Sequence, residues 1–348
     1  MSPISLRGHT LFILILPILA VTCGCGGSAS SGISSSCTSN CSTTTTGATV
    51  TTVYTYSTNP TALALNGSST LDVADDSSLV HQLNLAASPV TSTDIAGNGT
   101  YGYTGDNGLA TDAELENPWG VAVDLSNNIY IADRPARVVR RVDTNGTITT
   151  FVGTGVCAND GDNGPSYNAN VCTPQGLAID PTGRYLYIAD LSYNVRRVDL
   201  TTGIITTAAG GGSSTADGVA ATTALLTPDS IAVDASGNLY IGDHNHENIR
   251  KVSGATGLIT TVTGNGTYGD SGDGNQASNA VITSPNSITF SPAGNIYFSD
   301  NSGVRRIDIT TGVITTVTGV TGSSLLFDSL GNLYAIDGRV IEKVTGIN

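Results

Sequence analysis

The chain has 348 residues, of which only 12% are charged, and a formal net charge of −14 at pH 7. An acidic protein repels phosphate groups and anionic lipid headgroups, so nucleic acids and membrane surfaces are excluded as expected partners. The few charged residues and the 42 glycines are typical of an all-β protein with many turns.

Residues 1–25 have the composition of a secretion signal. Arg7 supplies a positive charge, and the apolar run Leu11–Val21 is too short to cross a membrane as a helix, which takes about 20 residues. The cysteines that follow resemble the lipobox of bacterial lipoproteins, which implies lipid attachment at Cys23 or Cys25. The alternative is a secreted protein with two unmodified cysteines. We therefore expect export, either to the cell envelope through a lipid anchor or as a secreted protein.

Residues 26–46 are predicted to form a disordered tether. Ser and Thr dominate this segment and apolar residues are nearly absent, so it cannot bury a core of its own. Cys37 and Cys41 lie within it and could close a small disulfide loop. A tether of this kind would let an anchored domain stand away from its membrane.

A repeated unit fills the rest of the chain, and residues 118–155 show it best. Gly120–Asp124 and Ile129–Asp133 are short, apolar and rich in β-branched residues, as buried strands are. Val138–Asp143 has polar residues on one face, and Thr147–Val152 alternates Thr with apolar residues, which is typical of an outer strand. The unit therefore predicts four strands and no long helix.

Six such units are present, and their starts are Pro60, Pro118, Pro174, Pro228, Pro285 and Gly322. The four best copies start 54 to 57 residues apart, and a period of this length with four strands predicts a six-bladed β-propeller. The last unit has only three strands. Gly47–Tyr56 resembles the missing strand, so we expect it to complete the last blade and close the ring. The propeller is predicted to span residues 47–348.

A disulfide is expected between Cys157 and Cys172. These cysteines bracket the loop between two units, and the equivalent loops contain none. Two thiols outside the cytoplasm tend to oxidise, so the disulfide is favoured over free thiols.

The motifs PWGVAVD, NIYIAD, VRRV and GTITTFVG resemble the NHL-repeat family, and the Gly-Asp-rich connecting loops resemble its bacterial and teneurin-like branch. The resemblance covers about residues 47–348 and implies a six-bladed propeller with a central channel. It also implies a functional face formed by the loops that lead into the inner strands. The residues at those starts are Thr61, Trp119, Gln175, Asp229, Asn286 and Ser323.

Several acidic residues are candidates for structural or metal-binding roles. An Asp ends the second strand of every unit, and a residue repeated in each blade is expected to cap turn amides or pair with the Arg residues of the third strand rather than to catalyse. The Gly-Asp-rich loops offer oxygen ligands for calcium, although they lack the spacing of an EF-hand. The calcium candidates are Asp160, Asp162, Asp270 and Asp273.

The predicted binding residues lie on the same face. His244 and His246 follow a second strand, and Trp119 could stack on a sugar or anchor a partner's side chain, or simply fill the channel mouth. Asp229 and Asn286 loosely resemble the metal ligands of gluconolactonase-like propellers, but in the reverse order. No residue is predicted to be catalytic.

The sequence therefore predicts an exported, monomeric NHL-type scaffold that binds a protein or a glycan on its loop face without making or breaking bonds. The alternative is a metal-dependent hydrolase or lyase with its site in the channel. The repeats identify neither a ligand nor a catalytic activity, because propellers carry unrelated functions.

Overall fold

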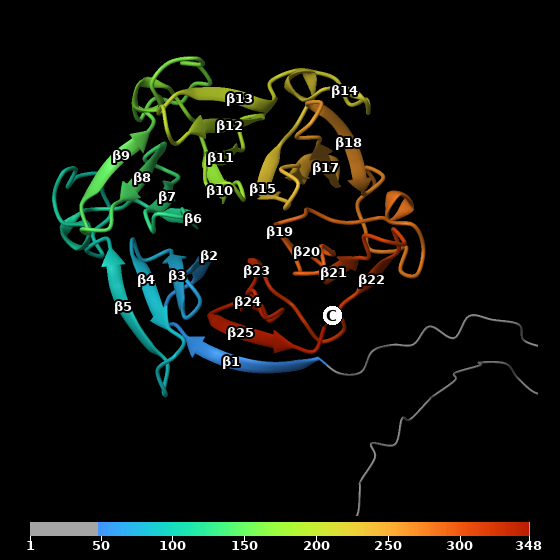
Figure 1. The fold of residues 1–348 in the computed structure, drawn as a ribbon, viewed down its shortest axis with the longest axis horizontal. Coiled ribbons are helices and arrows are strands. Elements are labelled where there is room, and N and C mark those ends of the chain that lie inside the picture. The colour runs from blue at the N-terminus through green and yellow to red at the C-terminus, as the bar shows by residue number, and fades with distance from the viewer. Residues whose placement is uncertain (1–47, 348) are drawn as a thin grey trace, which may run out of the picture. The chain divides into compact units, whose positions relative to one another are not determined.

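The computed structural model describes residues 48–347, which form six antiparallel sheets arranged as the blades of a propeller (Figure 1). Five sheets have four strands and one has a fifth. The all-β, six-bladed prediction is therefore confirmed. The predicted signal, the tether and Cys23, Cys25, Cys37 and Cys41 lie outside the described residues. Within residues 48–347 no helix is long and apolar enough to cross a membrane.

Each blade has an inner strand at the channel and three further strands toward the rim. The inner strands are β2 (Pro60–Asn66), β6 (Pro118–Val123), β10 (Pro174–Ile179), β15 (Pro228–Val233), β19 (Ser287–Phe290) and β23 (Leu325–Phe327). The second strands are β3 (Thr70–Asp75), β7 (Ile129–Asp133), β11 (Tyr185–Asp190), β16 (Leu239–Asp243), β20 (Ile296–Asp300) and β24 (Leu333–Asp337).

The third strands are β4 (Val80–Asn84), β8 (Val138–Val142), β12 (Asn194–Asp199), β17 (Asn248–Val252), β21 (Gly303–Ile307) and β25 (Val340–Thr345). The outer strands are β5 (Thr91–Ala96), β9 (Ile148–Val152), β13 (Ile205–Gly210), β18 (Leu258–Thr263), β22 (Ile314–Thr316) and β1 (Thr49–Thr55). The connecting loops add the short strand β14 (Val219–Ala220) and four short 3-10 turns. These turns are η1 (Ala110–Asp112), η2 (Ser166–Asn168), η3 (Ala221–Thr223) and η5 (Ala277–Asn279). A fifth turn, η4 (His244–His246), follows β16.

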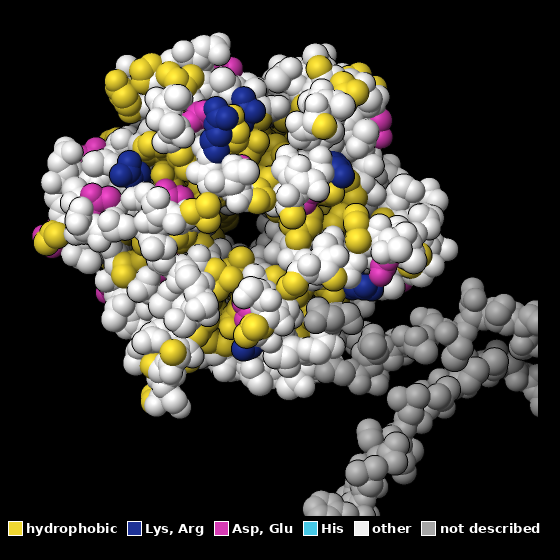
Figure 2. Space-filling view, viewed as in Figure 1, with side chains coloured by type: hydrophobic (Ala, Val, Ile, Leu, Met, Phe, Trp, Pro, Cys, Tyr) yellow, Lys and Arg dark blue, Asp and Glu magenta, His cyan; other side chains and the backbone are white. Residues whose placement is uncertain are grey.

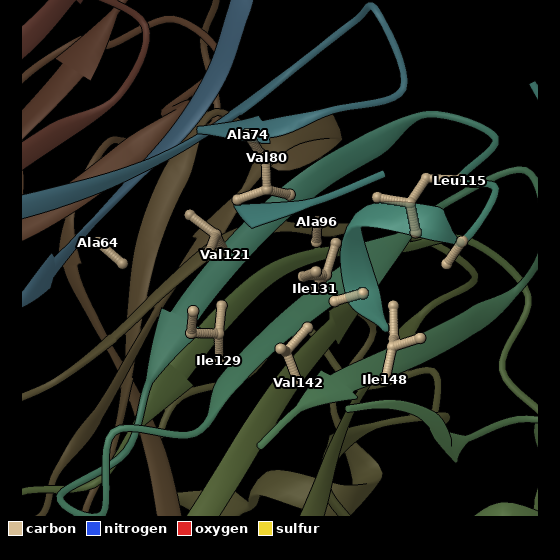
Figure 3. Packing of buried hydrophobic residues seen from close by; sticks show 12 residues of the cluster. Ala64, Ala74, Val80, Ala96, Leu115, Val121, Ile129, Ile131, Val142 and Ile148 are labelled. Carbon is tan, nitrogen blue, oxygen red and sulfur yellow. The ribbon is translucent and has the colours of Figure 1, made fainter. Parts of the chain in front are cut away.

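The hydrophobic core lies between neighbouring blades. Figure 3 shows Ala74 and Val80 of the first blade packed beside Val121 and Ile131 of the second, and all four are buried. The second strands are apolar on both faces because each packs against two neighbouring blades. The inner strands approach so closely that a Cβ at Gly120 would meet the carbonyl of Gln175. Glycine is therefore required at residue 120, although other blades have Ala62, Ser230 or Ser287 at the equivalent position.

The first described strand closes the ring. β1 pairs antiparallel with β25, from Thr49 opposite Thr345 to Thr55 opposite Val340, so the first and last described strands share the sixth blade (Figure 1). The predicted closure is confirmed. It leaves no open seam between the first and last units.

The Asp that ends the second strand caps backbone amides, as predicted. Asp133 accepts hydrogen bonds from the amides of Glu116 and Asn117 at 3.0 to 3.1 Å. Asp190 accepts from the amides of Cys172 and Thr173. In blades 2 to 4 these bonds fix the segment that leads into the inner strand, because a buried carboxylate needs donors and a buried amide needs an acceptor.

The buried Arg residues of the third strands have other partners than the sequence suggested. Arg140, Arg196, Arg250 and Arg305 pair mainly with Asp residues of the Gly-Asp-rich loops, at N–O distances of 2.5 to 3.1 Å. The Asp at the end of the second strand is 4.0 Å from the nearest of them in the fifth blade. The loops therefore lie against the blades through buried charge-assisted hydrogen bonds.

The predicted disulfide joins Cys157 and Cys172, which are 15 residues apart. Replacing both with Ser should lower the free energy of unfolding by about 3 kcal/mol, because a loop of this length is constrained in the unfolded chain. Urea denaturation of the variant and of the wild-type protein, with and without a reductant, would measure this. An unchanged midpoint would contradict a stabilising role.

In the first blade His81 occupies the position that Arg holds in blades 2 to 5. Its Nε2 is 3.0 Å from Asp75 and its Nδ1 is 2.7 Å from Asp94. Burial lowers the pKa of His81, but the hydrogen bonds and charges of Asp75 and Asp94 outweigh it and raise the pKa above 6.5. Burial likewise raises the pKa of Asp75, and bonds from His81, Ser77 and Thr58 bring it down to about 2.

This arrangement predicts a loss of stability at alkaline pH. A raised histidine pKa contributes stability that is complete below the unfolded value and is lost as the pH rises through the folded value. Wild-type protein should therefore lose about 1 to 3 kcal/mol more between pH 6 and pH 9 than His81→Gln, the range for a hydrogen bond to a charged group. Urea midpoints of both proteins at the two pH values test this, and equal differences would refute it.

Candidate functional site

The inner strands of all six blades line a central cavity of about 850 Å³. Figure 2 shows the opening at the centre of the ring, with hydrophobic side chains in the depressions around it. All six residues that the sequence placed at the starts of the inner strands line this cavity: Thr61, Trp119, Gln175, Asp229, Asn286 and Ser323. Alternating Ala, Leu, Ile and Val residues of the same strands form the rest of the wall. The end of the cavity where the inner strands start is therefore polar, and the rest of its wall is largely apolar.

Asp229 is the centre of the polar end. Gln175, which is only 4% exposed, donates a hydrogen bond from Nε2 to Oδ1 of Asp229. The second carboxylate oxygen, Oδ2, lies 3.5 Å from Nδ1 of His244. The buried Oε1 of Gln175 has no partner among the described residues. Three neighbouring side chains thus present a carboxylate, an amide and an imidazole.

Trp119 and Arg134 extend this group on the neighbouring blade. The guanidinium of Arg134 lies over the Trp119 ring, 4.8 Å from its centroid, which is a favourable cation–π arrangement. Trp119 is 37% exposed. Trp119, Arg134, Gln175, Asp229 and His244 are called the mouth cluster below.

The electrostatic environment of Asp229 is unusual for a carboxylate near a surface. Burial raises its pKa above the ordinary value, and the charges of His244 and Arg134 offset only part of this effect. Desolvation disfavours the charged form, and nearby positive charge favours it. A ligand that donates hydrogen bonds or positive charge to Asp229 would therefore replace solvation that the folded protein has removed.

Sequence reasoning missed Arg134. It follows Asp133 as His244 follows Asp243, so the two residues occupy the same place in the loops after the second strands of blades 2 and 4. The repeat alignment alone could have identified Arg134, although its stacking on Trp119 depends on how the loop after β7 meets the start of β6.

The remaining predicted residues lie apart from the mouth cluster. Asn286 lines the cavity on the blade after Asp229. His246 turns to its own blade, where its Nδ1 is 2.8 Å from Asp243, so it does not join His244. Within residues 48–347, no three His, Cys, Asp or Glu side chains are grouped so that they could hold a metal ion.

The calcium candidates lie on the connecting loops, away from the channel. Asp162 pairs with Arg196 at 2.7 Å, and Asp270 and Asp273 both pair with Arg305. Asp160 accepts a hydrogen bond from Asn170 at 2.8 Å. These carboxylates already have partners, so a calcium ion would have to compete with buried guanidinium groups or share the oxygens.

The sequence of this chain is similar to part of the teneurins. The family model of the teneurin NHL domain matches residues 98–159 and 266–329. Teneurin-1 of Mus musculus is 30% identical over 228 residues, which are 58% of this chain and 8% of teneurin-1. The chain therefore spans only a small part of the length of the curated relatives that it matches.

Solved structures share the fold at low sequence identity. An auxiliary nutrient binding protein of Bacteroides ovatus is 12% identical with a TM-score of 0.60, over 86% of this chain and 76% of that protein. A gluconolactonase of Xanthomonas campestris is 15% identical with a TM-score of 0.58, over 85% of this chain and 89% of the enzyme. At this identity the likeness concerns the fold alone.

Proposed function

The chain belongs to the NHL-repeat family of six-bladed β-propellers, and from this premise we propose that it is a binding scaffold whose ligand lies against the mouth cluster. The ligand is a protein or a glycan. The rigid ring holds the mouth cluster in place, so binding orders few side chains and costs little conformational entropy. Export is part of this proposal. It is supported by the signal-like composition of residues 1–25 and by the Cys157–Cys172 disulfide, since disulfides persist outside the cytoplasm.

The mouth cluster itself carries the proposal. It combines an exposed aromatic ring, a carboxylate, an amide and an imidazole at the end of a mostly apolar cavity. Ligand sites generally join apolar walls with a few convergent polar groups. Trp119 and Arg134 are two of the three side-chain types that are enriched in binding hot spots.

The test uses Trp119, because it is the only Trp of the chain. Its fluorescence reports on the mouth cluster without any label. Purified protein should be titrated with neutral oligosaccharides in one series and with peptides in another. A saturable shift of the emission by members of one series would identify the ligand class. Saturable binding by calorimetry without any change in the Trp119 emission would contradict the proposed location.

Asp229→Asn should separate binding from stability. Because the folded state raises the pKa of Asp229, ionisation at pH 7 opposes folding, and the stability of the wild type should increase as the pH falls through that pKa. The neutral variant should melt about 1 to 4 °C higher, which corresponds to roughly 1 kcal/mol at most, and should bind its ligand more weakly. Thermal unfolding and the Trp119 titration measure both effects.

The matched control is Asp112→Asn, which removes the same charge from an exposed residue of η1. It should change neither the melting temperature nor the titration. Weaker stability of Asp229→Asn together with unchanged binding would overturn a ligand-binding role for Asp229.

The second candidate function is a metal-dependent hydrolase or lyase in the channel. The neighbouring positions of Asp229 and Asn286 on the cavity wall, together with the raised pKa of Asp229, favour it as an alternative. Melting temperatures with EDTA, calcium and zinc distinguish the candidates, because a metal that binds only the folded state raises the melting temperature. A metal-selective rise that Asp229→Asn abolishes would support the enzyme, and one that Asp273→Asn abolishes would support calcium in the loops.

A further inference from the structure

The outer edges of four blades are covered by the chain itself. In blades 2 to 5 the connecting loop runs along the outer strand. It exchanges backbone hydrogen bonds with the first half of that strand. The amide of Asn107 bonds to the carbonyl of Ile148, that of Asn163 to Ile205, that of Gly218 to Ile259 and that of Gly274 to Ile314, all at 2.8 Å. Each loop thus acts as a short fifth strand.

The same loops supply an Asp that lies at the outer edge. In blades 3, 4 and 5 this Asp pairs with the buried Arg of the third strand and also accepts the amide of an outer-strand Thr. The Thr amides are those of Thr207, Thr261 and Thr316, at 2.8 to 3.0 Å. An edge that would otherwise present free amides is therefore closed by backbone and by a carboxylate.

Blade 6 has the same register but neither covering element. Thr52 of β1 lies opposite Glu342, and the register shift between Thr52 and Tyr54 repeats the shift that follows Thr207 in blade 3. Glu342 therefore occupies the position of the buried Arg, with the opposite charge. Among residues 48–347, β1 pairs with β25 alone, and Thr49–Thr52 are exposed.

We propose that this outer edge, β1 with Glu342 beside it, docks an extended segment of a partner protein that carries a Lys or Arg side chain. The backbone of such a segment would accept the hydrogen bond of the Thr52 amide, as the loop Asp does in blades 3 to 5. Its basic side chain would meet Glu342, where the other blades join a loop Asp to an Arg. Strand addition at a sheet edge obtains affinity from the backbone and specificity from side chains at alternate positions.

Charge and composition favour this occupant over others. Burial raises the pKa of Glu342, and the charge of the nearby Asp337 raises it further. A positive charge beside Glu342 would therefore stabilise its ionised carboxylate. Lys343 does not supply it, because adjacent strand residues point to opposite faces and Lys343 lies over the Tyr334 ring. The segment 26–46 of this chain contains no Lys or Arg. β1 itself has no charged residue and no Pro, two of the features that block pairing at an exposed edge.

The test uses the full chain and two fluorescein-labelled peptides, GTVTKVTVG and GTVTDVTVG, followed by fluorescence anisotropy. The Lys peptide should bind saturably and about fivefold more tightly than the Asp peptide, which corresponds to about 1 kcal/mol for an exposed ion pair. Glu342→Lys should reverse the preference. Asp112→Lys, on the covered second blade, should leave the preference of the wild type unchanged.

Thr52→Pro removes the edge amide and should weaken both peptides equally. Equal affinity for both peptides, or no binding of either to the wild type, would overturn the proposal. So would a dimer in light scattering that Thr52→Pro dissociates, because the edge would then belong to a second copy of this chain. Glu342→Lys keeps the test decisive even if Thr52→Pro does not fold, since it leaves the backbone of β1 unchanged.

Discussion

Deletion of residues 47–58 should lower the melting temperature by about 10 to 20 °C, the shift expected for a loss of roughly 5 kcal/mol in a domain of this size. The deletion removes all pairing of β25 with β1 and exposes its outer edge. It also removes Tyr56, which is 8% exposed and packs against His81 with ring centroids 5.0 Å apart. The loss of one large buried aromatic side chain alone costs about 3 to 5 kcal/mol.

The control is a deletion of residues 26–46, which the sequence predicts to contribute no core. That variant should melt within about 2 °C of the wild type, since changes away from packed or hydrogen-bonded groups have small effects. Calorimetry of both variants decides the question. If the two deletions had equal effects, ring closure by β1 would not stabilise the propeller.

Arg305→Leu should be the most destabilising single substitution, by about 3 to 5 kcal/mol, because it leaves the buried carboxylate of Asp300, 4.0 Å away, without a neighbouring positive charge. Arg305 is fully buried, and its two terminal nitrogens lie 2.7 Å from Asp270 and 2.5 Å from Asp273. Asp273 in turn holds the amide of Thr316 on the outer strand. The substitution would therefore release the loop from the blade as well as break the ion pairs.

The adjacent Arg306 is the matched control. It is half-buried and pairs with Asp308 at 2.8 Å, so Arg306→Gln should cost less than about 1 kcal/mol. Urea denaturation of the two variants measures the difference, and hydrogen exchange of the Gly274–Asn279 amides should accelerate only in Arg305→Leu. Equal costs for both substitutions would mean that burial of Arg305 adds nothing to the pair.

The candidate site was predictable in part. The repeat alignment placed Trp119, Gln175, Asp229 and Asn286 at equivalent positions, and all four line the cavity. It did not separate His244 from His246, two residues apart, although one lies beside Asp229 and the other beside Asp243. That difference depends on how η4 turns, which apolar periodicity does not report.

By itself the sequence determined the number of blades, the strand order within them, the closing strand and the Cys157–Cys172 pair, because each of these is written in local periodicity or in spacing along the chain. Only the tertiary structure decided which Asp each buried Arg holds, how Arg134 meets Trp119 and which outer edges stay open. Those contacts join residues from different strands and loops of a blade. They form when the ring brings distant segments together, and no repeat in the sequence specifies them.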